Sequence, residues 1–88
     1  MHIRLSASYY RALRKFLKGN KRNVTKAQKA IEIFKKNPNH PSLNLEKLSG
    51  SKVWTIRIDK GNRIFLYWID KSTALFIDIG KHDKYRRY

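Results

Sequence analysis

The sequence contains no cysteine, so neither a disulfide nor a thiolate-bound metal can stabilise the fold. It also lacks any run near the ~18 apolar residues that a membrane-spanning helix requires. The first residues, MHIRLSAS, lack the apolar segment of a secretion signal. At 88 residues the chain is long enough for one hydrophobic core only. We therefore expect a single domain, residues 1–88, that works in the reducing cytoplasm and does not enter the membrane.

Acidic residues are scarce as well: six Asp and Glu stand against 21 Lys and Arg, for a formal net charge of +15. The basic residues occur in both halves of the chain and are not confined to one tail. Such an excess indicates a polyanionic partner, which could be a nucleic acid, a ribosome or an acidic protein. Basicity that serves solubility alone is the plainer alternative.

The first part of the chain shows the 3.6-residue period of amphipathic helices. Residues 2–5 predict a short strand, and Ser6 or Ser8 can cap a first helix that ends at the pair Gly19-Asn20. The apolar stripe that should face the core is Tyr10, Leu13, Phe16 and Leu17. This pattern predicts the first arm of a helical hairpin.

Proline is rare, and Pro38, one of only two, limits the second arm. A proline disfavours helical geometry at the residue before it, so a second helix that begins at Asn23 or Thr25 must stop before Pro38. Its core-facing stripe is Val24, Ala27, Ile31 and Phe34. The two helices together predict a hairpin with one apolar face.

After Gly50 the apolar period changes from 3.6 to 2, which is typical of strands. The segments VWTIRID (53–59), RIFLYWI (63–69) and TALFIDI (73–79) predict an antiparallel meander, with a turn at KGN. A register in which paired residue numbers sum to 122 places Trp54 opposite Trp68. The residues expected on the face that the helices cover are Trp54, Ile56, Ile58, Ile64, Leu66, Trp68, Leu75, Ile77 and Ile79.

The same register predicts an open face that carries cations and aromatic rings. It pairs Arg57 with Phe65, Asp59 with Arg63 and Thr55 with Tyr67. The residues expected to gather on this face are Arg57, Arg63, Asp78, Phe65, Tyr67, Phe76 and, if the last strand continues through Gly80, His82. Rings that stack on bases beside cations that meet phosphates suit single-stranded RNA. Arginines that are merely solvated on an exposed sheet are the alternative.

RNA transesterification is the reaction for which such a face would need to supply the fewest catalytic groups, because the substrate supplies its own nucleophile, the 2′-OH. A guanidinium group donates two parallel hydrogen bonds to phosphate oxygens, so Arg57 and Arg63 can stabilise the charge of the transition state. An imidazole, here His82, can donate or accept a proton near neutral pH. His2 and His40 are isolated, and no further ligands are spaced for a metal beside His82-Asp83. We therefore expect neither a metal nor another cofactor.

Four segments, read in order, resemble the RelE/YoeB/ParE superfamily of type II toxins: HPSLNLEKLSG (40–50), VWTIRI (53–58), NRIFLYWID (62–70) and IDIGKHDKYRRY (77–88). The resemblance covers essentially the whole chain. It implies a two-layer α+β fold: an N-terminal strand, a helical hairpin, then an antiparallel β meander with the helices packed on one face.

The resemblance also implies roles for individual residues. Arg63 matches the arginine that steadies the scissile phosphate, and Arg57 a basic position on the preceding strand. His82 falls where the family places its general acid, and Glu46 aligns with the loop glutamate that acts as general base in YoeB-like members; a solvated loop carboxylate is the alternative for Glu46. Tyr85 and Tyr88 both match the family tyrosine that orients the substrate, and the spacing favours Tyr88. Further RNA contacts are expected from Lys52, Phe65, Tyr67, Lys81, Lys84, Tyr85, Arg86 and Arg87.

In function, the resemblance implies the toxin of a type II toxin–antitoxin pair. It implies an endoribonuclease that cleaves mRNA in the ribosomal A site through the 2′-OH, without metal, and so inhibits translation. A ParE-like inhibitor of DNA gyrase that cleaves nothing is the first alternative, and a non-catalytic RNA- or ribosome-binding module is the second. Each toxin alternative implies a cognate antitoxin, and the +15 charge predicts that it binds through an acidic or amphipathic segment.

Overall fold

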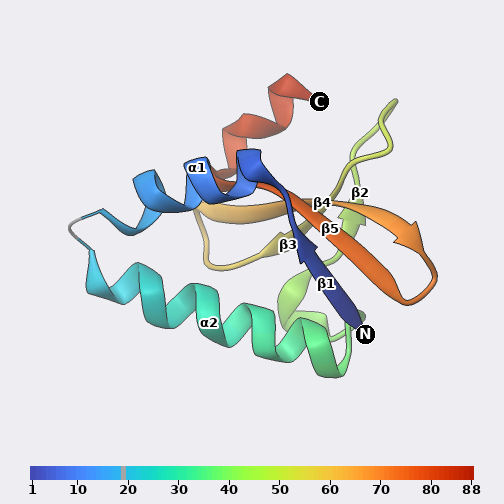
Figure 1. The fold of residues 1–88 in the computed structure, drawn as a ribbon, viewed down its shortest axis with the longest axis horizontal. Coiled ribbons are helices and arrows are strands. Elements are labelled where there is room, and N and C mark those ends of the chain that lie inside the picture. The colour runs from blue at the N-terminus through green and yellow to red at the C-terminus, as the bar shows by residue number, and fades with distance from the viewer. Residues whose placement is uncertain (19) are drawn as a thin grey trace.

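The computed structural model describes residues 1–18 and 20–88, and it packs two helices against a five-stranded sheet (Figure 1). Along the chain the elements are β1 (His2–Leu5), α1 (Ala7–Leu17), α2 (Lys21–Lys36), a 3₁₀ turn η1 (Pro41–Leu43), β2 (Glu46–Lys47), β3 (Trp54–Arg57), β4 (Asn62–Asp70), β5 (Thr73–Lys81) and a 3₁₀ segment η2 (His82–Arg87). The sheet order is β1-β5-β4-β3-β2. Only the β1–β5 pair is parallel among the described strands. The predicted α+β fold, with its strand, helical hairpin and meander, is confirmed.

Helix α1 begins after Ser6, one of the two predicted caps, whose side-chain oxygen accepts a hydrogen bond from the Tyr9 N–H at 3.0 Å. The Ser6 N–H itself donates to the carbonyl of Phe76 on β5, so the first turn is fixed against the sheet. Tyr9 consequently packs on Phe76, with ring centres 5.5 Å apart, and is 1% exposed. Tyr10, which was predicted in the core, is 50% exposed, and that prediction was wrong by one position.

Helix α2 begins earlier than predicted because a different residue caps it. The side chain of Asn20 accepts hydrogen bonds from the N–H groups of Arg22 and Asn23, so neither Asn23 nor Thr25 is the cap. The predicted end of the first helix falls partly on Gly19, which lies outside the described residues. The C-terminal end of α2 before Pro38 is confirmed.

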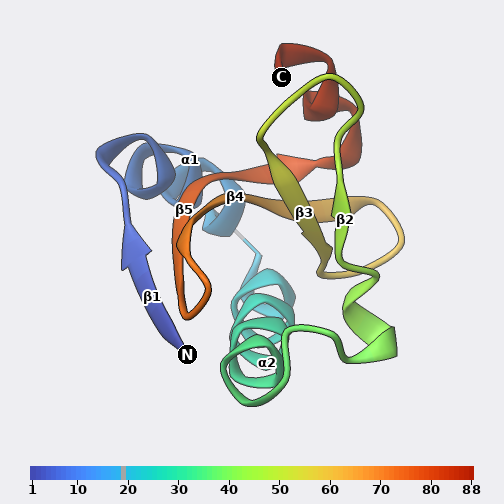
Figure 2. The same cartoon turned by 90° about the vertical axis from the view of Figure 1, so that its right-hand side faces the viewer.

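Helix α2 lies below the sheet in Figure 2, and its apolar face closes the main core. Its buried residues are Ala27, Ala30 and Phe34. Val24, which was predicted in the core, is exposed. Phe34 packs against both Trp68 and Phe76 of the sheet, with ring centres 5.8 and 5.7 Å apart. No helix in the described part of the chain is long and apolar enough to cross a membrane.

The register of β3 with β4 differs from the prediction by two residues, since paired numbers sum to 120: Trp54 lies opposite Leu66, and Arg57 opposite Arg63. The cause is Asp59, which was predicted to pair within the sheet. Its carboxylate instead caps the turn by accepting a hydrogen bond from the Gly61 N–H at 2.9 Å. Because a shift of two leaves every side chain on its own face, the predicted faces of this hairpin are correct although the predicted pairs are wrong.

The pairing of β4 with β5 skips Ile77, because Phe76 and Asp78 pair with adjacent residues of β4. This bulge reverses the faces of the first part of β5. Phe76, which was predicted on the open face, is fully buried in the main core, whereas Leu75 and Ile77 lie on the opposite face. The predicted faces of Phe76, Leu75 and Ile77 were therefore wrong. Ile79, beyond the bulge, faces the main core as predicted.

The second face of the sheet is covered over part of its area by a smaller apolar cluster. The loop before β3 and the C-terminal segment approach each other over this face (Figure 2). The cluster consists of Val53, Phe65, Ile77, Leu48, Leu75 and Tyr88. Phe65 is fully buried there, so in this structure it is not the base-stacking platform that was predicted.

Candidate functional site

A hollow of about 280 Å³ opens on the second face of the sheet, beside the small apolar cluster. Its lining comes from β2, the loop after it, β3, β4 and η2 and consists of Glu46, Leu48, Thr55, Arg63, His82 and Tyr85. Three residues predicted as general base, phosphate ligand and general acid, namely Glu46, Arg63 and His82, therefore meet around one space. We call this hollow the site pocket.

Arg63 enters the site pocket from the start of β4, and the β3–β4 turn holds its side chain. Its Nη1 donates to the backbone carbonyls of Asp59 at 2.8 Å and Asn62 at 3.0 Å. Burial and the neighbouring Arg57 lower the pKa of the Arg63 guanidinium, while Glu46 and Asp59 act in the opposite direction. Because the ordinary value is so high, the group remains a cation near neutral pH. A positioned cation of this kind suits a phosphate.

His82 reaches the pocket by a different course from the one predicted. Strand β5 ends at Lys81, and His82 begins the 3₁₀ segment η2, so the strand does not continue through it. The His82 N–H donates to the Gly61 carbonyl at 2.9 Å. The β3–β4 turn therefore fixes the backbone of His82 and the side chain of Arg63 together.

Glu46 faces the pocket from β2, the edge strand of the sheet. It pairs with Thr55 of β3, which is 3% exposed and also lines the pocket. Thr55 in turn pairs with Phe65 of β4, two residues beyond Arg63 and on the same face. The Glu46 carboxylate is exposed, so it can meet solvent or a substrate group without first being desolvated.

Of the two C-terminal tyrosines, the structure brings Tyr85 to the site pocket and not Tyr88. Tyr85 is 47% exposed on the pocket wall. The Tyr88 hydroxyl instead donates to Asp78 at 2.8 Å, and its ring lies 5.4 Å from that of Phe65. Burial, followed by the Asp78 carboxylate, raises the pKa of the Tyr88 phenol. Tyr88 is thus fixed against the sheet.

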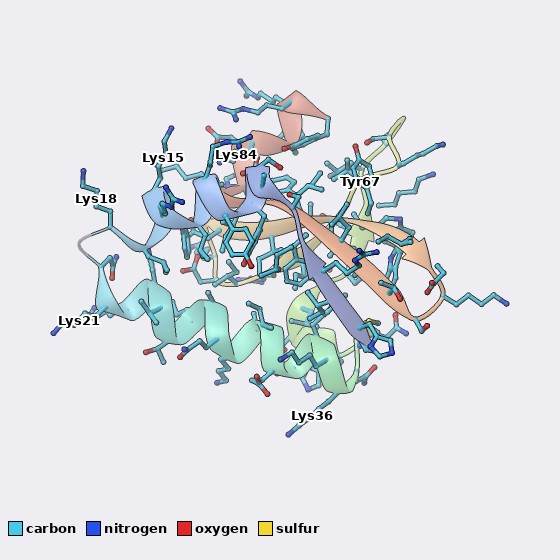
Figure 3. The ribbon with its side chains drawn as sticks, in the orientation of Figure 1. Lys15, Lys18, Lys21, Lys36, Tyr67 and Lys84 are labelled. Carbon is cyan, nitrogen blue, oxygen red and sulfur yellow. The ribbon has the colours of Figure 1, made fainter. Side chains whose placement is uncertain are left out.

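The other predicted RNA contacts lie around the pocket. Arg57 is opposite Arg63 in the register but lines a separate hollow near α2, with Lys26 and Lys29. Tyr67 is 38% exposed on the second face, and Lys84 is bound to Asp78 at 2.8 Å beside α1; Figure 3 labels both side chains. The remaining predicted cations are exposed: Lys52, Lys81, Arg86 and Arg87.

Sequence reasoning did not assign Thr55, Leu48 or the turn that holds the site. The alternation in VWTIRID had placed Thr55 on the correct face, and that was the available signal. Asp59 was assigned to a strand, and only KGN was recognised as the turn that reverses the chain. Its carbonyl groups, which hold Arg63 and His82, follow from the three-dimensional course and have no signature in the sequence.

The α+β fold, with its helical hairpin and five-stranded sheet, matches the folds of RelE/YoeB-like toxins of known structure. A YoeB/ParE toxin from Agrobacterium tumefaciens matches with a TM-score of 0.74 at 20% identity, over 93% of this chain and 99% of that one. The YoeB–YefM complex from Staphylococcus aureus matches with a TM-score of 0.71 at 19% identity, over 93% and 97%.

YafQ from E. coli matches with a TM-score of 0.74 at 12% identity, over 92% of each chain. No family model and no curated protein sequence matches the chain. At these identities the likeness establishes the fold across nearly the whole length of each protein. The chemistry must therefore be argued from the residues of the site pocket.

Proposed function

We propose that this chain is the toxin of a type II toxin–antitoxin pair and that it cleaves mRNA on the ribosome. The observation that carries the proposal is the meeting of Glu46, Arg63, His82 and Tyr85 around one pocket of about 280 Å³. A carboxylate, an imidazole and a guanidinium can supply the base, the acid and the charge stabilisation that phosphodiester transesterification requires. The toxin-like fold and the +15 charge support the same function.

In the proposed reaction the RNA 2′-oxygen attacks the adjacent phosphorus, and the bond to the 5′-oxygen of the next nucleotide breaks. Glu46 accepts the proton of the 2′-OH, and His82 donates a proton to the leaving 5′-oxygen. Arg63 stabilises the charge that develops on the phosphoryl oxygens, and Tyr85 stacks on a base. The products are a 2′,3′-cyclic phosphate and a 5′-hydroxyl.

The proposal includes a protein antitoxin. A structural neighbour was crystallised as a heterotetrameric YoeB–YefM toxin–antitoxin complex, at 18% identity to this chain. A surface with formal charge +15 favours an acidic segment as the partner. Such a segment would neutralise the toxin if it covered the site pocket.

A ParE-like gyrase inhibitor is the second candidate, because one neighbour is described as a YoeB/ParE toxin. An inhibitor that only binds does not need a carboxylate, a guanidinium and an imidazole around one pocket. Loss of His82 would therefore leave its toxicity unchanged, whereas the nuclease would be inactivated. The response to His82→Ala separates the two candidates.

The test is primer extension on an mRNA in a bacterial translation extract. Wild-type protein is compared with His82→Ala and with His2→Ala, in which the lost histidine lies on β1, at the opposite edge of the sheet from β2. A ribosome-free reaction containing EDTA is run beside them. We expect new RNA 5′ ends within codons for the wild type and His2→Ala, and none for His82→Ala.

Intact mRNA at concentrations that stop growth would contradict the nuclease, and the same preparations would then be assayed for inhibition of gyrase supercoiling. RNA that is bound with steep salt dependence but stays intact would instead indicate a non-catalytic RNA-binding module.

A further inference from the structure

Beneath the C-terminal segment lies a buried carboxylate that the proposed chemistry does not use. Asp78 of β5 is 5% exposed and accepts three hydrogen bonds in the structure. The donors are the Ile79 N–H at 2.9 Å, Lys84 Nζ at 2.8 Å and the Tyr88 hydroxyl at 2.8 Å. Two of these donors, Lys84 and Tyr88, belong to the last residues of the chain and tie them to the sheet.

These contacts keep Asp78 ionised. Burial raises the pKa of its carboxyl, but the hydrogen bonds from Lys84, Tyr88 and the Ile79 N–H outweigh burial and bring the pKa below its ordinary value. A buried carboxylate is stable only with such partners, so the interaction is mutual. If one donor is lost, the remaining groups are left with an incompletely compensated charge.

The segment that these contacts hold cannot be stable alone. Segment η2 spans six residues, His82–Arg87, none of which is buried, and no side chain caps its start. Short 3₁₀ turns have poor hydrogen-bond geometry and depend on their surroundings. At its far end the Tyr88 ring packs on Phe65 within the small apolar cluster. Lys84 and Tyr88 thus fasten η2 at two points.

Gly80 is shaped to let Lys84 reach Asp78. Its φ of +151° is one that other residues rarely adopt, and a Cβ there would lie 2.9 Å from Lys84 Cε. The lysine stem therefore lies across the glycine, and Nζ also donates to the Ile79 carbonyl at 3.2 Å. The sequence DIGKHDK combines the carboxylate, the glycine and the lysine in one short stretch.

Because a 3₁₀ helix has three residues per turn, side chains of η2 that are three residues apart lie on the same side of it. Two sides of η2 therefore line two different hollows. His82 and Tyr85, three apart, line the site pocket. Lys84 and Arg87, also three apart, line a second hollow of about 460 Å³ against α1, and Tyr88 turns back to the sheet at its edge. Figure 3 shows Lys84 between α1 and the C-terminal segment. The side of η2 that carries Lys84 is bound to the sheet, and it therefore determines the direction in which His82 and Tyr85 point.

We infer that Asp78 is a positioning residue. With Gly80, Lys84 and Tyr88 it forms a latch that fixes η2, so that His82 and Tyr85 face Arg63. The latch itself is a statement about structure, whereas its effect on cleavage rests on the proposed nuclease function.

The latch is tested first without reference to activity, by the ¹H–¹⁵N heteronuclear NOE of the backbone amides. The variants are Asp78→Asn and Tyr88→Phe, and the control is Asp70→Asn, whose carboxylate binds the turn between β4 and β5 at Ser72. We expect lower NOE values for residues 82–88 in both variants, with the β3 and β4 amides unchanged. Tyr88→Phe removes one hydroxyl and keeps the ring, so it serves if Asp78→Asn does not fold. An unchanged NOE across residues 82–88 in the folded variants would overturn the latch.

The second readout is cleavage on programmed ribosomes. We expect Asp78→Asn to lower kcat between about 10-fold and 100-fold with a smaller change in KM, because a displaced acid lowers the rate more than it weakens binding. Added to His82→Ala, the same substitution should leave any residual cleavage rate, measured at high enzyme concentration and long times, unchanged. A loosened segment with unchanged kcat would overturn the positioning role. A loosened segment in a protein that never cleaves RNA would refute the proposed function and leave the latch standing.

Discussion

At the scale of single residues, the two C-terminal tyrosines show how one hydroxyl can be committed to structure and another left free for a substrate. The Tyr88 hydroxyl is bound to Asp78 and its ring to Phe65. Tyr85 lies on the site pocket at 47% exposure. We therefore place Tyr85 in the site and Tyr88 in the support beneath it, although the sequence had favoured Tyr88.

Alkaline pH tests the environment of the buried phenols. Burial raises the pKa of Tyr9 to about 12, and burial together with Asp78 raises that of Tyr88 as well. A raised folded-state pKa gives stability that is complete below the unfolded value of about 10 and is lost as pH rises through the folded value. We expect the free energy of unfolding, from urea titrations, to fall above pH 10 and to fall less in Tyr88→Phe. Equal slopes in the two proteins would contradict this.

At the scale of elements, the β3–β4 turn organises the site. Its Asp59 carbonyl accepts from Arg63, and its Gly61 carbonyl accepts from the His82 N–H. The Asp59 carboxylate closes the turn through Gly61 and Asn62 and also bonds Lys26 at 3.3 Å. These hydrogen bonds outweigh burial and lower the pKa of Asp59. A turn with such side-chain closure can hold two site residues at once.

Removing the Asp59 carboxylate should loosen both site residues. We expect Asp59→Ala to lower the free energy of unfolding by about 1.5–3 kcal/mol, the usual contribution of a hydrogen bond to a charged group, and also to reduce mRNA cleavage. Urea unfolding and primer extension measure the two effects. Glu32→Ala is the matched control, because it removes one negative charge from an exposed position on α2. Equal losses in both variants would show that charge, and not the turn, is responsible.

The sequence predicted the elements well because apolar period is a local property. The change of period after Gly50 located three strands, and the proline after α2 located its end. Alternation also placed Arg57, Thr55 and Arg63 on one face, which the register confirms.

The remaining errors have non-local causes. The register shifted by two because the Asp59 side chain closes the turn, and the faces of β5 reversed because of a bulge at Ile77, which has no signature in TALFIDI. Tyr88 was favoured for the site because its spacing resembled that of RelE-like toxins, and the last strand was expected to continue to His82. The structure instead begins a 3₁₀ segment there, and this determines which tyrosine reaches the pocket.

At the scale of the whole molecule, most of the positive charge has no acidic partner. The ion pairs in the described part of the chain are Lys26–Asp59, Lys35–Glu32 and Lys84–Asp78, against 21 basic residues in the sequence. Lysines project from several sides of the molecule in Figure 3. Repulsion of this kind lowers the stability of the isolated protein and favours a polyanionic partner.

Salt should therefore stabilise the free protein. We expect Tm to rise between about 0.05 M and about 0.5 M potassium chloride, since screening weakens repulsion between exposed charges. The comparison is Lys18→Glu/Lys21→Glu, two exposed positions, where each change removes two units and the formal charge falls from +15 to +11. A smaller rise is expected for this variant. An equal rise in both proteins would assign the effect to ion exclusion and not to charge repulsion.

The reaction that we propose for the site pocket is RNA cleavage through the substrate's own 2′-OH. Its most direct test uses ribosomes programmed with two short mRNAs that differ only by a 2′-deoxy sugar at the cleaved nucleotide. Wild-type protein is compared with Arg63→Lys, which keeps the charge but loses the paired donors. We predict a 2′,3′-cyclic phosphate end on the ribose message, no cleavage of the deoxy message, and a rate for Arg63→Lys lower by about 100-fold or more. Cleavage of the deoxy message would rule out attack by the 2′-OH, and cleavage of neither message at doses that arrest translation would rule out the nuclease.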